Sequence, residues 1–158
     1  KIFANLPVIE NIRVGAFFGP PKSPSPAEAT REAIELLEFV GLSKVAGAPA
    51  KDLTLANQKR LEVARALATK PELLLLDELM AGLNQTEVTQ AIDLVKKIRE
   101  KGVTIIMIEH VMKAIMSMCD RIIVLNYGKK IAEGTPQEIV NSQTVIEVYL
   151  GEQSSVGS

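Results

Sequence analysis

The sequence contains no tryptophan, and aromatic residues make up only 4% of its 158 residues. A buried core must therefore consist mainly of Leu, Ile, Val, Ala and Met. The single cysteine, Cys119, excludes an intrachain disulfide and favours a reducing compartment. The longest apolar runs, Leu73–Leu76 and Ile105–Ile108, are far shorter than the roughly 20 residues that span a bilayer. We therefore expect a soluble chain, one that can still dock on a membrane protein.

The chain also has almost no excess of charge, with 18 basic and 19 acidic residues and a net charge of −1. Nucleic-acid binding relies on a concentrated basic surface, and here Lys and Arg are spread along the chain. We therefore predict no nucleic-acid partner. A hydrophobic content of 47% is typical of a globular protein, and the length suits one domain or two associated subdomains.

Residues 1–70 are predicted to form a helical subdomain. "VIENI" at residues 8–12 is expected to open a short helix, and Gly19–Pro26, which holds four of the eight prolines, is expected to be a loop. One helix is predicted from Ala27 to a cap at Gly41. Another is predicted from Thr54, a plausible N-cap, to about Thr69.

Residues 71–158 alternate between strand and helix patterns. Residues 72–78 and 103–110 are predicted to be strands buried on both faces, with an amphipathic helix at 84–102 between them. A helix at 111–120, two strands joined by the turn "NYGK" within 121–134, short helices at 135–140 and 143–150, and a loose tail at 154–158 complete the prediction. The fold class is therefore α/β, with parallel strands followed by a β-hairpin.

Polar side chains follow both predicted buried strands. Asp77 and Glu78 end the first strand, and Glu109 and His110 end the second. Since ligands bind beyond the carboxyl ends of parallel strands, these groups would share one crevice if the strands are neighbours. Asp77 could then hold Mg²⁺ through water, Glu78 could polarise an attacking water and His110 could contact a terminal phosphate. The alternative is that the carboxylates are cap or loop residues and that His110 is structural.

The stretch "LTLANQKRLEVARALATKPELLLLDELMAGLN", followed by "TIIMIEH", resembles the ATP-binding subunits of ABC transporters. The family's elements occur in order: a signature loop at Leu53–Asn57, a Walker B strand at Leu73–Glu78, a D-loop at Ala81–Asn84 and a switch histidine at His110. The resemblance implies the C-terminal part of a P-loop NTPase fold. It also implies ATP and Mg²⁺ as cofactors, Asp77 as the metal residue, and Glu78 and His110 as catalytic residues.

Nucleotide-contacting residues are also implied by this resemblance. They are Thr54, Leu55, Ala56 and Asn57 of the signature loop and Ala81, Gly82, Leu83 and Asn84 of the D-loop. In the family these loops complete the ATP site of a second ATPase subunit, and a helix N-terminus offers free amides to a phosphate. The other reading of Thr54 is that it only caps a helix.

Membrane permease subunits and a peripheral location on the cytoplasmic face of the membrane follow from the same resemblance. Within the family, the chain looks closest to the ATPases of branched-chain amino acid uptake. The stretches that suggest this are "RLEVARAL", "AGLN", "IEH" followed by Val-Met, "VLNYGKKIAEGTP" and "VIEVYLGE".

The sequence also departs from the family. The two signature glycines fall at Leu55 and Ala56, whose Cβ atoms restrict positive φ and crowd a phosphate. The proline usual after the Asp-Glu pair is Leu79. No G-x-x-x-x-G-K-[ST] phosphate loop occurs. The most similar stretch is "GAFFGPPK", but Pro20 and Pro21 lack the backbone N–H donors that bind a phosphate.

We therefore expect the C-terminal portion of an ATPase subunit, a fragment without its phosphate loop. The 158 residues alone are expected to bind ATP weakly, to leave ATP unhydrolysed and to expose an apolar patch. The alternative is a non-catalytic partner module that supplies only the signature side of a composite ATP site. A DNA-repair or chromosome ATPase would need coiled-coil heptads or a basic face, and the sequence has neither.

Overall fold

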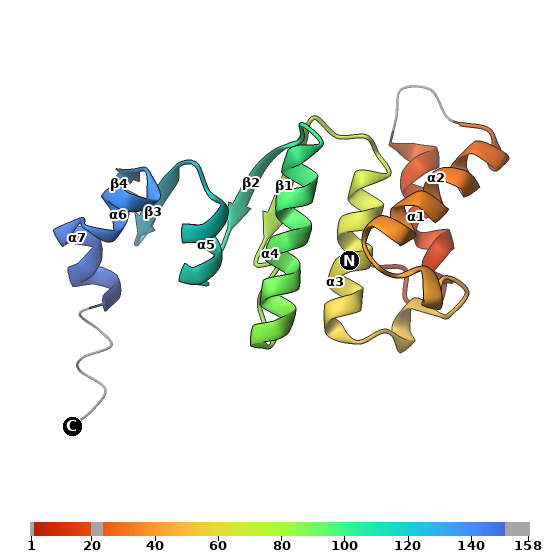
Figure 1. Ribbon diagram of the computed structural model, residues 1–158, viewed down its shortest axis with the longest axis horizontal. Coiled ribbons are helices and arrows are strands. Elements are labelled where there is room, and N and C mark those ends of the chain that lie inside the picture. The colour runs from red at the N-terminus through yellow and green to blue at the C-terminus, as the bar shows by residue number, and fades with distance from the viewer. Residues whose placement is uncertain (1, 20–23, 151–158) are drawn as a thin grey trace. The chain divides into compact units, whose positions relative to one another are not determined.

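The computed structural model describes residues 2–19 and 24–150. By its contacts the chain divides into two compact units, residues 1–109 and residues 110–158, which are considered separately (Figure 1). The predicted proline-rich loop includes residues 20–23, which lie outside the described residues, as does the predicted tail at 154–158. The division predicted from sequence pattern, at residues 70 and 71, stays a prediction.

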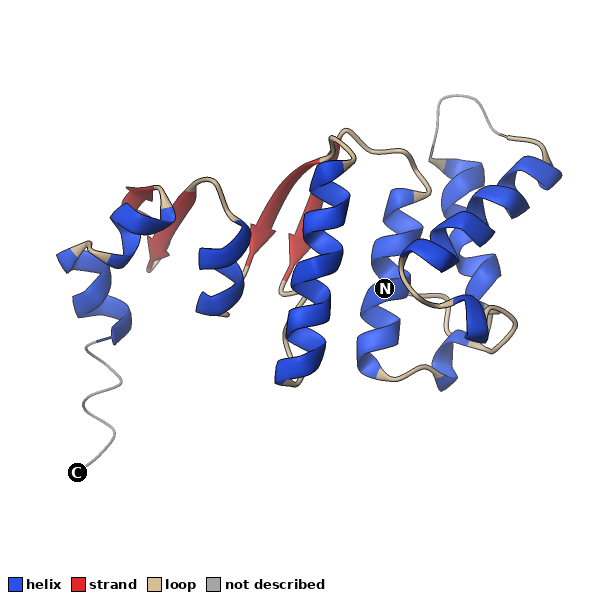
Figure 2. Ribbon diagram, in the orientation of Figure 1, coloured by secondary structure: helices blue, strands red, loops and turns tan. Residues whose placement is uncertain are grey.

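Helices dominate the first part of unit 1. They are α1 (Val8–Phe18), α2 (Pro26–Phe39) and α3 (Leu55–Leu67), with short 3₁₀ turns η1 (Ser43–Val45) and η2 (Ala50–Asp52) between α2 and α3 (Figure 2). Helix α1 packs against both α2 and α3. Ile12, Leu37 and Leu61, one from each helix, are almost fully buried in this core.

Gly15 explains why α1 can lie so close to α3. A Cβ built on Gly15 would be 2.4 Å from the carbonyl oxygen of Arg65 and 3.1 Å from the Cβ of Ala68. Glycine usually weakens a helix interior, so the local pattern favours ending the helix early. The helix instead continues beyond "VIENI" to Phe18, because the missing side chain allows close packing.

Two parallel strands and a connecting helix complete unit 1. They are β1 (Leu73–Asp77), α4 (Gln85–Glu100) and β2 (Thr104–Ile108). Strands β1 and β2 are paired in parallel, with Leu73 opposite Thr104 and Asp77 opposite Ile108. The predicted amphipathic helix is confirmed: the expected apolar stripe of Val88, Ala91, Ile92, Val95 and Ile98 is buried. Leu94 is buried with it.

The prediction that these strands are buried on both faces is wrong. Leu74 and Leu76 are buried, but the alternate side chains are not, because no described element covers the second face. The exposed fractions of its aliphatic side chains are 47% for Leu73, 68% for Leu75, 55% for Ile106 and 64% for Ile108. We call these four residues the open sheet face. They confirm the predicted apolar patch.

Unit 2 contains α5 (Met112–Met118), the antiparallel hairpin of β3 (Ile122–Asn126) and β4 (Lys129–Gly134), α6 (Pro136–Val140), α7 (Gln143–Val145) and the π-helical turn η3 (Ile146–Leu150). The predicted hairpin is confirmed. Its turn places Tyr127 and Gly128 at φ of 46° and 74°, as a tight hairpin turn requires. Val124, Ile139 and Val145 form a small core. No helix in the described parts of either unit is long and apolar enough to cross a membrane.

Candidate functional site

Asp77 and Glu78 lie where the two parallel strands end. Asp77 is the last residue of β1 and is opposite Ile108, the last residue of β2. The backbone N–H of Glu78 donates to the carbonyl oxygen of Ile108 over 2.9 Å. The two strands are therefore neighbours, which is the condition for Asp77, Glu78 and Glu109 to lie at one edge of the sheet. The side chains of Asp77 and Glu78 are both exposed, as a site that receives a ligand from solvent requires.

The backbone turns sharply at Glu78. Its φ is +46°, a left-handed value that few residues other than glycine adopt. The turn is stabilised from inside, because Leu79 and Met80 are buried. It is also stabilised by hydrogen bonds: the Met80 N–H donates to Oε1 of Glu109 over 2.8 Å, and Nζ of Lys59 donates to the Glu78 carbonyl over 2.7 Å. No motif in the sequence pointed to Lys59, and Glu109 stood out only as the residue before His110.

The signature loop leads directly into α3. Thr54 is the N-cap, and its hydroxyl accepts a hydrogen bond from the Asn57 N–H over 3.4 Å, so the predicted cap is confirmed. Leu55 and Ala56 are the first two residues of α3 and have ordinary helical backbone conformations. The expected conflict between their Cβ atoms and positive φ therefore does not arise. Ala56 is buried, whereas Leu55 is about half exposed.

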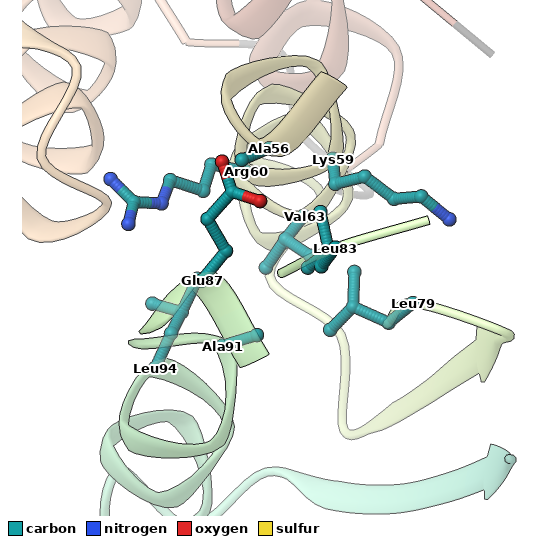
Figure 3. A pocket seen from close by; sticks show the side chains of 9 residues that line it. All are labelled: Ala56, Lys59, Arg60, Val63, Leu79, Leu83, Glu87, Ala91 and Leu94. Carbon is teal, nitrogen blue, oxygen red and sulfur yellow. The ribbon is translucent and has the colours of Figure 1, made fainter. Parts of the chain in front are cut away.

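The predicted signature loop and D-loop are in contact through Leu55 and Gly82. A Cβ on Gly82 would lie 2.9 Å from Cδ2 of Leu55, and Gly82 has a φ of +78°. Beside this contact is a small, mostly apolar pocket between α3, the turn after β1, and α4 (Figure 3). Its lining residues are Ala56, Lys59, Arg60, Val63, Leu79, Leu83, Glu87, Ala91 and Leu94.

Asn84, the last residue of the predicted D-loop, is the N-cap of α4. Its Oδ1 accepts hydrogen bonds from the backbone N–H groups of Thr86 and Glu87, each over 3.0 Å. In return, the Glu87 carboxylate accepts a hydrogen bond from the backbone N–H of Asn84, which completes a capping box. The structure thus gives Asn84 a definite local role, and its contact with nucleotide stays a prediction.

His110 is the first residue of unit 2, directly after Glu109. Its place relative to Asp77 and Glu78 therefore stays a prediction.

Within residues 2–19 and 24–150, no three His, Cys, Asp or Glu side chains converge to hold a metal ion. A single exposed carboxylate such as Asp77 fits Mg²⁺ only as one ligand among waters and substrate phosphates, which is the usual environment of this ion.

Comparison with protein families identifies the class of protein. The family model described as "ABC transporter" matches residues 1–81, which is more than half of the chain, and "Branched-chain amino acid ATP-binding cassette transporter" matches residues 129–154. The chain belongs to the ABC transporter family.

Individual relatives agree with this assignment. The chain is 41% identical to the high-affinity branched-chain amino acid transport ATP-binding protein LivG of Escherichia coli over 96% of its own length and 65% of LivG. It is 39% identical to BraF of Pseudomonas aeruginosa, a protein of the same description, with the same two coverages. The chain thus spans about 65% of the length of these curated relatives.

A solved structure also agrees. The crystal structure of the ADP conformation of MJ1267, an ATP-binding cassette of an ABC transporter, superimposes with a TM-score of 0.78 at 26% identity. The superposition covers 94% of this chain and 64% of that one. The predicted fold class, a portion of an ABC ATPase, is confirmed.

Proposed function

We propose that this chain acts within the ATP-hydrolysing subunit of an ABC importer for branched-chain amino acids. One observation carries the proposal: the Asp77-Glu78 pair ends a parallel strand, and the loop that follows it meets the helix that begins at the signature loop. In this proposal the strand-end carboxylates act on the nucleotide of their own subunit, whereas the start of α3 offers its free amides to the nucleotide of a second subunit.

Each predicted residue has a proposed role in this reaction. Glu78 orients and polarises the attacking water, and its exposed carboxylate can accept a hydrogen bond from that water. Asp77 would hold Mg²⁺ through water, and the bound ion would supply positive charge that neutralises the phosphates. His110 contacts the terminal phosphate.

The two loops act on the nucleotide bound by a second ATPase subunit. The first-turn amides of α3, with the Thr54 hydroxyl, face a phosphate. The D-loop residues Ala81–Asn84 lie beside them through the contact of Gly82 with Leu55. Permease subunits in the membrane are the further partners, and the subunit lies peripherally on the cytoplasmic face. The branched-chain substrate class rests on the similarity to LivG and BraF, which are branched-chain amino acid transport ATP-binding proteins.

The test is ATP turnover by the full-length gene product with Mg²⁺, compared with its Glu78→Gln variant. We expect the variant to bind ATP with unchanged affinity and to lose at least about 99% of turnover, since general-base catalysis contributes about 10²–10⁴-fold. An Asp93→Asn variant is the matched control, because Asp93 is an exposed carboxylate on α4 outside the site. Equal turnover by the wild type and by Glu78→Gln refutes the catalytic role.

A second measurement concerns the 158 residues alone. We propose that they bind ATP weakly and do not hydrolyse it, because they contain no phosphate-loop motif. Turnover by this chain above that of its own Glu78→Gln variant contradicts the proposal. If the full-length gene product also fails to hydrolyse ATP yet forms a stable heterodimer with an active ATPase subunit, the chain is a non-catalytic partner module.

A further inference from the structure

We propose that Lys59 is a positioning residue that holds Glu78 in its catalytic orientation and ties it to the signature helix. This inference rests on the proposed function of Glu78. Its starting point is the hydrogen bond of 2.7 Å from the ammonium group of Lys59 to the backbone carbonyl of Glu78, two groups that are 19 residues apart in the sequence.

The conformation of Glu78 needs such a contact. A non-glycine residue at φ of +46° is strained and persists only when its surroundings determine it. Two contacts come from the sheet side: the Glu78 N–H donates to Ile108, and the Met80 N–H donates to Glu109. Lys59 supplies a further contact, and it comes from α3. The turn is therefore held between β2 and the signature helix.

The direction of the Glu78 carboxylate depends on this arrangement. Its Cβ projects from a backbone whose N–H is fixed by Ile108 and whose carbonyl is fixed by Lys59. The same carbonyl also accepts a hydrogen bond from the Ala81 N–H over 3.2 Å, which bends the chain toward the D-loop. Loss of the ammonium donor relaxes the left-handed backbone of Glu78, and a change in its φ redirects the Cβ and with it the carboxylate.

Lys59 also connects the site to the loop that faces nucleotide. It lies in the second turn of α3, and Thr54–Asn57 form the start of the same helix. Leu55 of this helix start lies against Gly82 in the loop that follows Glu78. Figure 3 shows Lys59 extending from α3 beside the small pocket that Leu79 and Leu83 also line. A displacement of the signature helix is thereby transmitted to the backbone of Glu78.

The test uses Lys59→Met in the full-length gene product, because methionine keeps most of the apolar stem and removes the donor. We expect kcat to fall about tenfold, since small misplacement of a catalytic group has effects of this size or larger, while the Kd for ATP stays within about twofold. Lys59→Arg keeps a donor and is expected to recover most of the activity. Lys44→Met is the matched control, because Lys44 is an exposed lysine of unit 1 outside the site.

Hydrogen exchange provides a readout that does not depend on turnover. Peptides that contain residues 78–80 are expected to exchange faster in Lys59→Met than in the wild type or in Lys44→Met. Unchanged kcat in Lys59→Met overturns the inference, and unchanged exchange does so as well. A different result also overturns it: the Kd for ATP rises by the same factor as kcat falls, and the melting temperature drops as well. That result indicates a merely structural role.

The two proposals can fail separately. If the wild type turns over ATP no faster than Glu78→Gln, the proposed catalytic function fails, and the exchange data still decide whether Lys59 holds the turn. If the wild type is active and Lys59→Met is equally active, only the role of Lys59 is refuted.

Discussion

Replacing Gly15 by alanine should destabilise the protein, although alanine is the better helix former. Gly15 lies inside α1, where it faces α3. The added methyl group would be 2.4 Å from the carbonyl oxygen of Arg65 and 3.2 Å from its Cγ. A carbon at 2.4 Å from a backbone oxygen cannot be accommodated by a side-chain rotation. Helices α1 and α3 must therefore move apart.

Two opposing effects set the magnitude. Alanine in place of glycine favours a helix by about 1 kcal/mol. An extra methyl group in a packed interior costs about 1–3 kcal/mol, occasionally more. The clash at Gly15 involves the backbone, so its cost lies at or above the upper end of this range, and we expect a net loss of about 2 kcal/mol. At about 2–4 °C per kcal/mol for a chain of this size, the melting temperature should fall by about 4–8 °C.

The assay is thermal or urea unfolding followed by circular dichroism, with Gly47→Ala as the matched control. A Cβ on Gly47 would have no neighbour within 4 Å, and Gly47 does not have positive φ. Gly47→Ala should therefore leave stability unchanged or raise it by up to about 1 kcal/mol. A Gly15→Ala protein that melts at or above the wild-type temperature refutes the argument, because helix propensity would then outweigh the α1–α3 contact.

Three further predictions concern polar contacts. Glu109→Ala should lower the free energy of unfolding in urea by about 1–3 kcal/mol, because the N–H of the buried Met80 loses its acceptor. Glu109→Gln keeps an acceptor, so an equal loss of stability in both variants contradicts this prediction. Asn84→Ala should lower helix stability by about 1 kcal/mol through loss of the α4 cap, and an unchanged melting temperature rules out that contribution. Hydrogen bonds from the backbone and hydroxyl of Thr135 lower the pKa of Glu138 from 4.5. The ionised carboxylate therefore stabilises the folded state fully above the unfolded-state pKa, and this contribution is lost as the pH falls through the folded-state pKa. The wild-type melting temperature should therefore exceed that of Glu138→Gln at neutral pH by a margin that shrinks on acidification, and a margin independent of pH contradicts the assignment.

Local patterns predicted the elements whose cause is local. The stripe on α4 needed only a 3.6-residue period, and the cap at Thr54 needed only a hydroxyl three residues before the bonded amide. The turn at Tyr127-Gly128 followed from its composition. In each case the stabilising contact lies within a few residues of the pattern, so the sequence was sufficient.

Contacts between distant segments were not predictable in this way. Gly15 resembles a helix breaker until Arg65 is known to lie against it. Lys59 resembles any other lysine on a helix, since its partner Glu78 is far away in the sequence. The strands were predicted to be buried on both faces because their side chains are apolar. Hydrophobicity shows that a side chain favours burial, but it does not show whether a neighbouring element is present to cover that side chain.

The open sheet face has a consequence for the heat capacity of the chain. Leu73, Leu75, Ile106 and Ile108 are already about half hydrated or more in the folded state, so unfolding exposes less new apolar surface at these positions. The heat-capacity change of unfolding should therefore fall below the usual value of about 12–15 cal/mol/K per residue, and the stability curve should be flatter. Any element that covers this face will bind with a negative heat-capacity change, which calorimetry can measure as a titration.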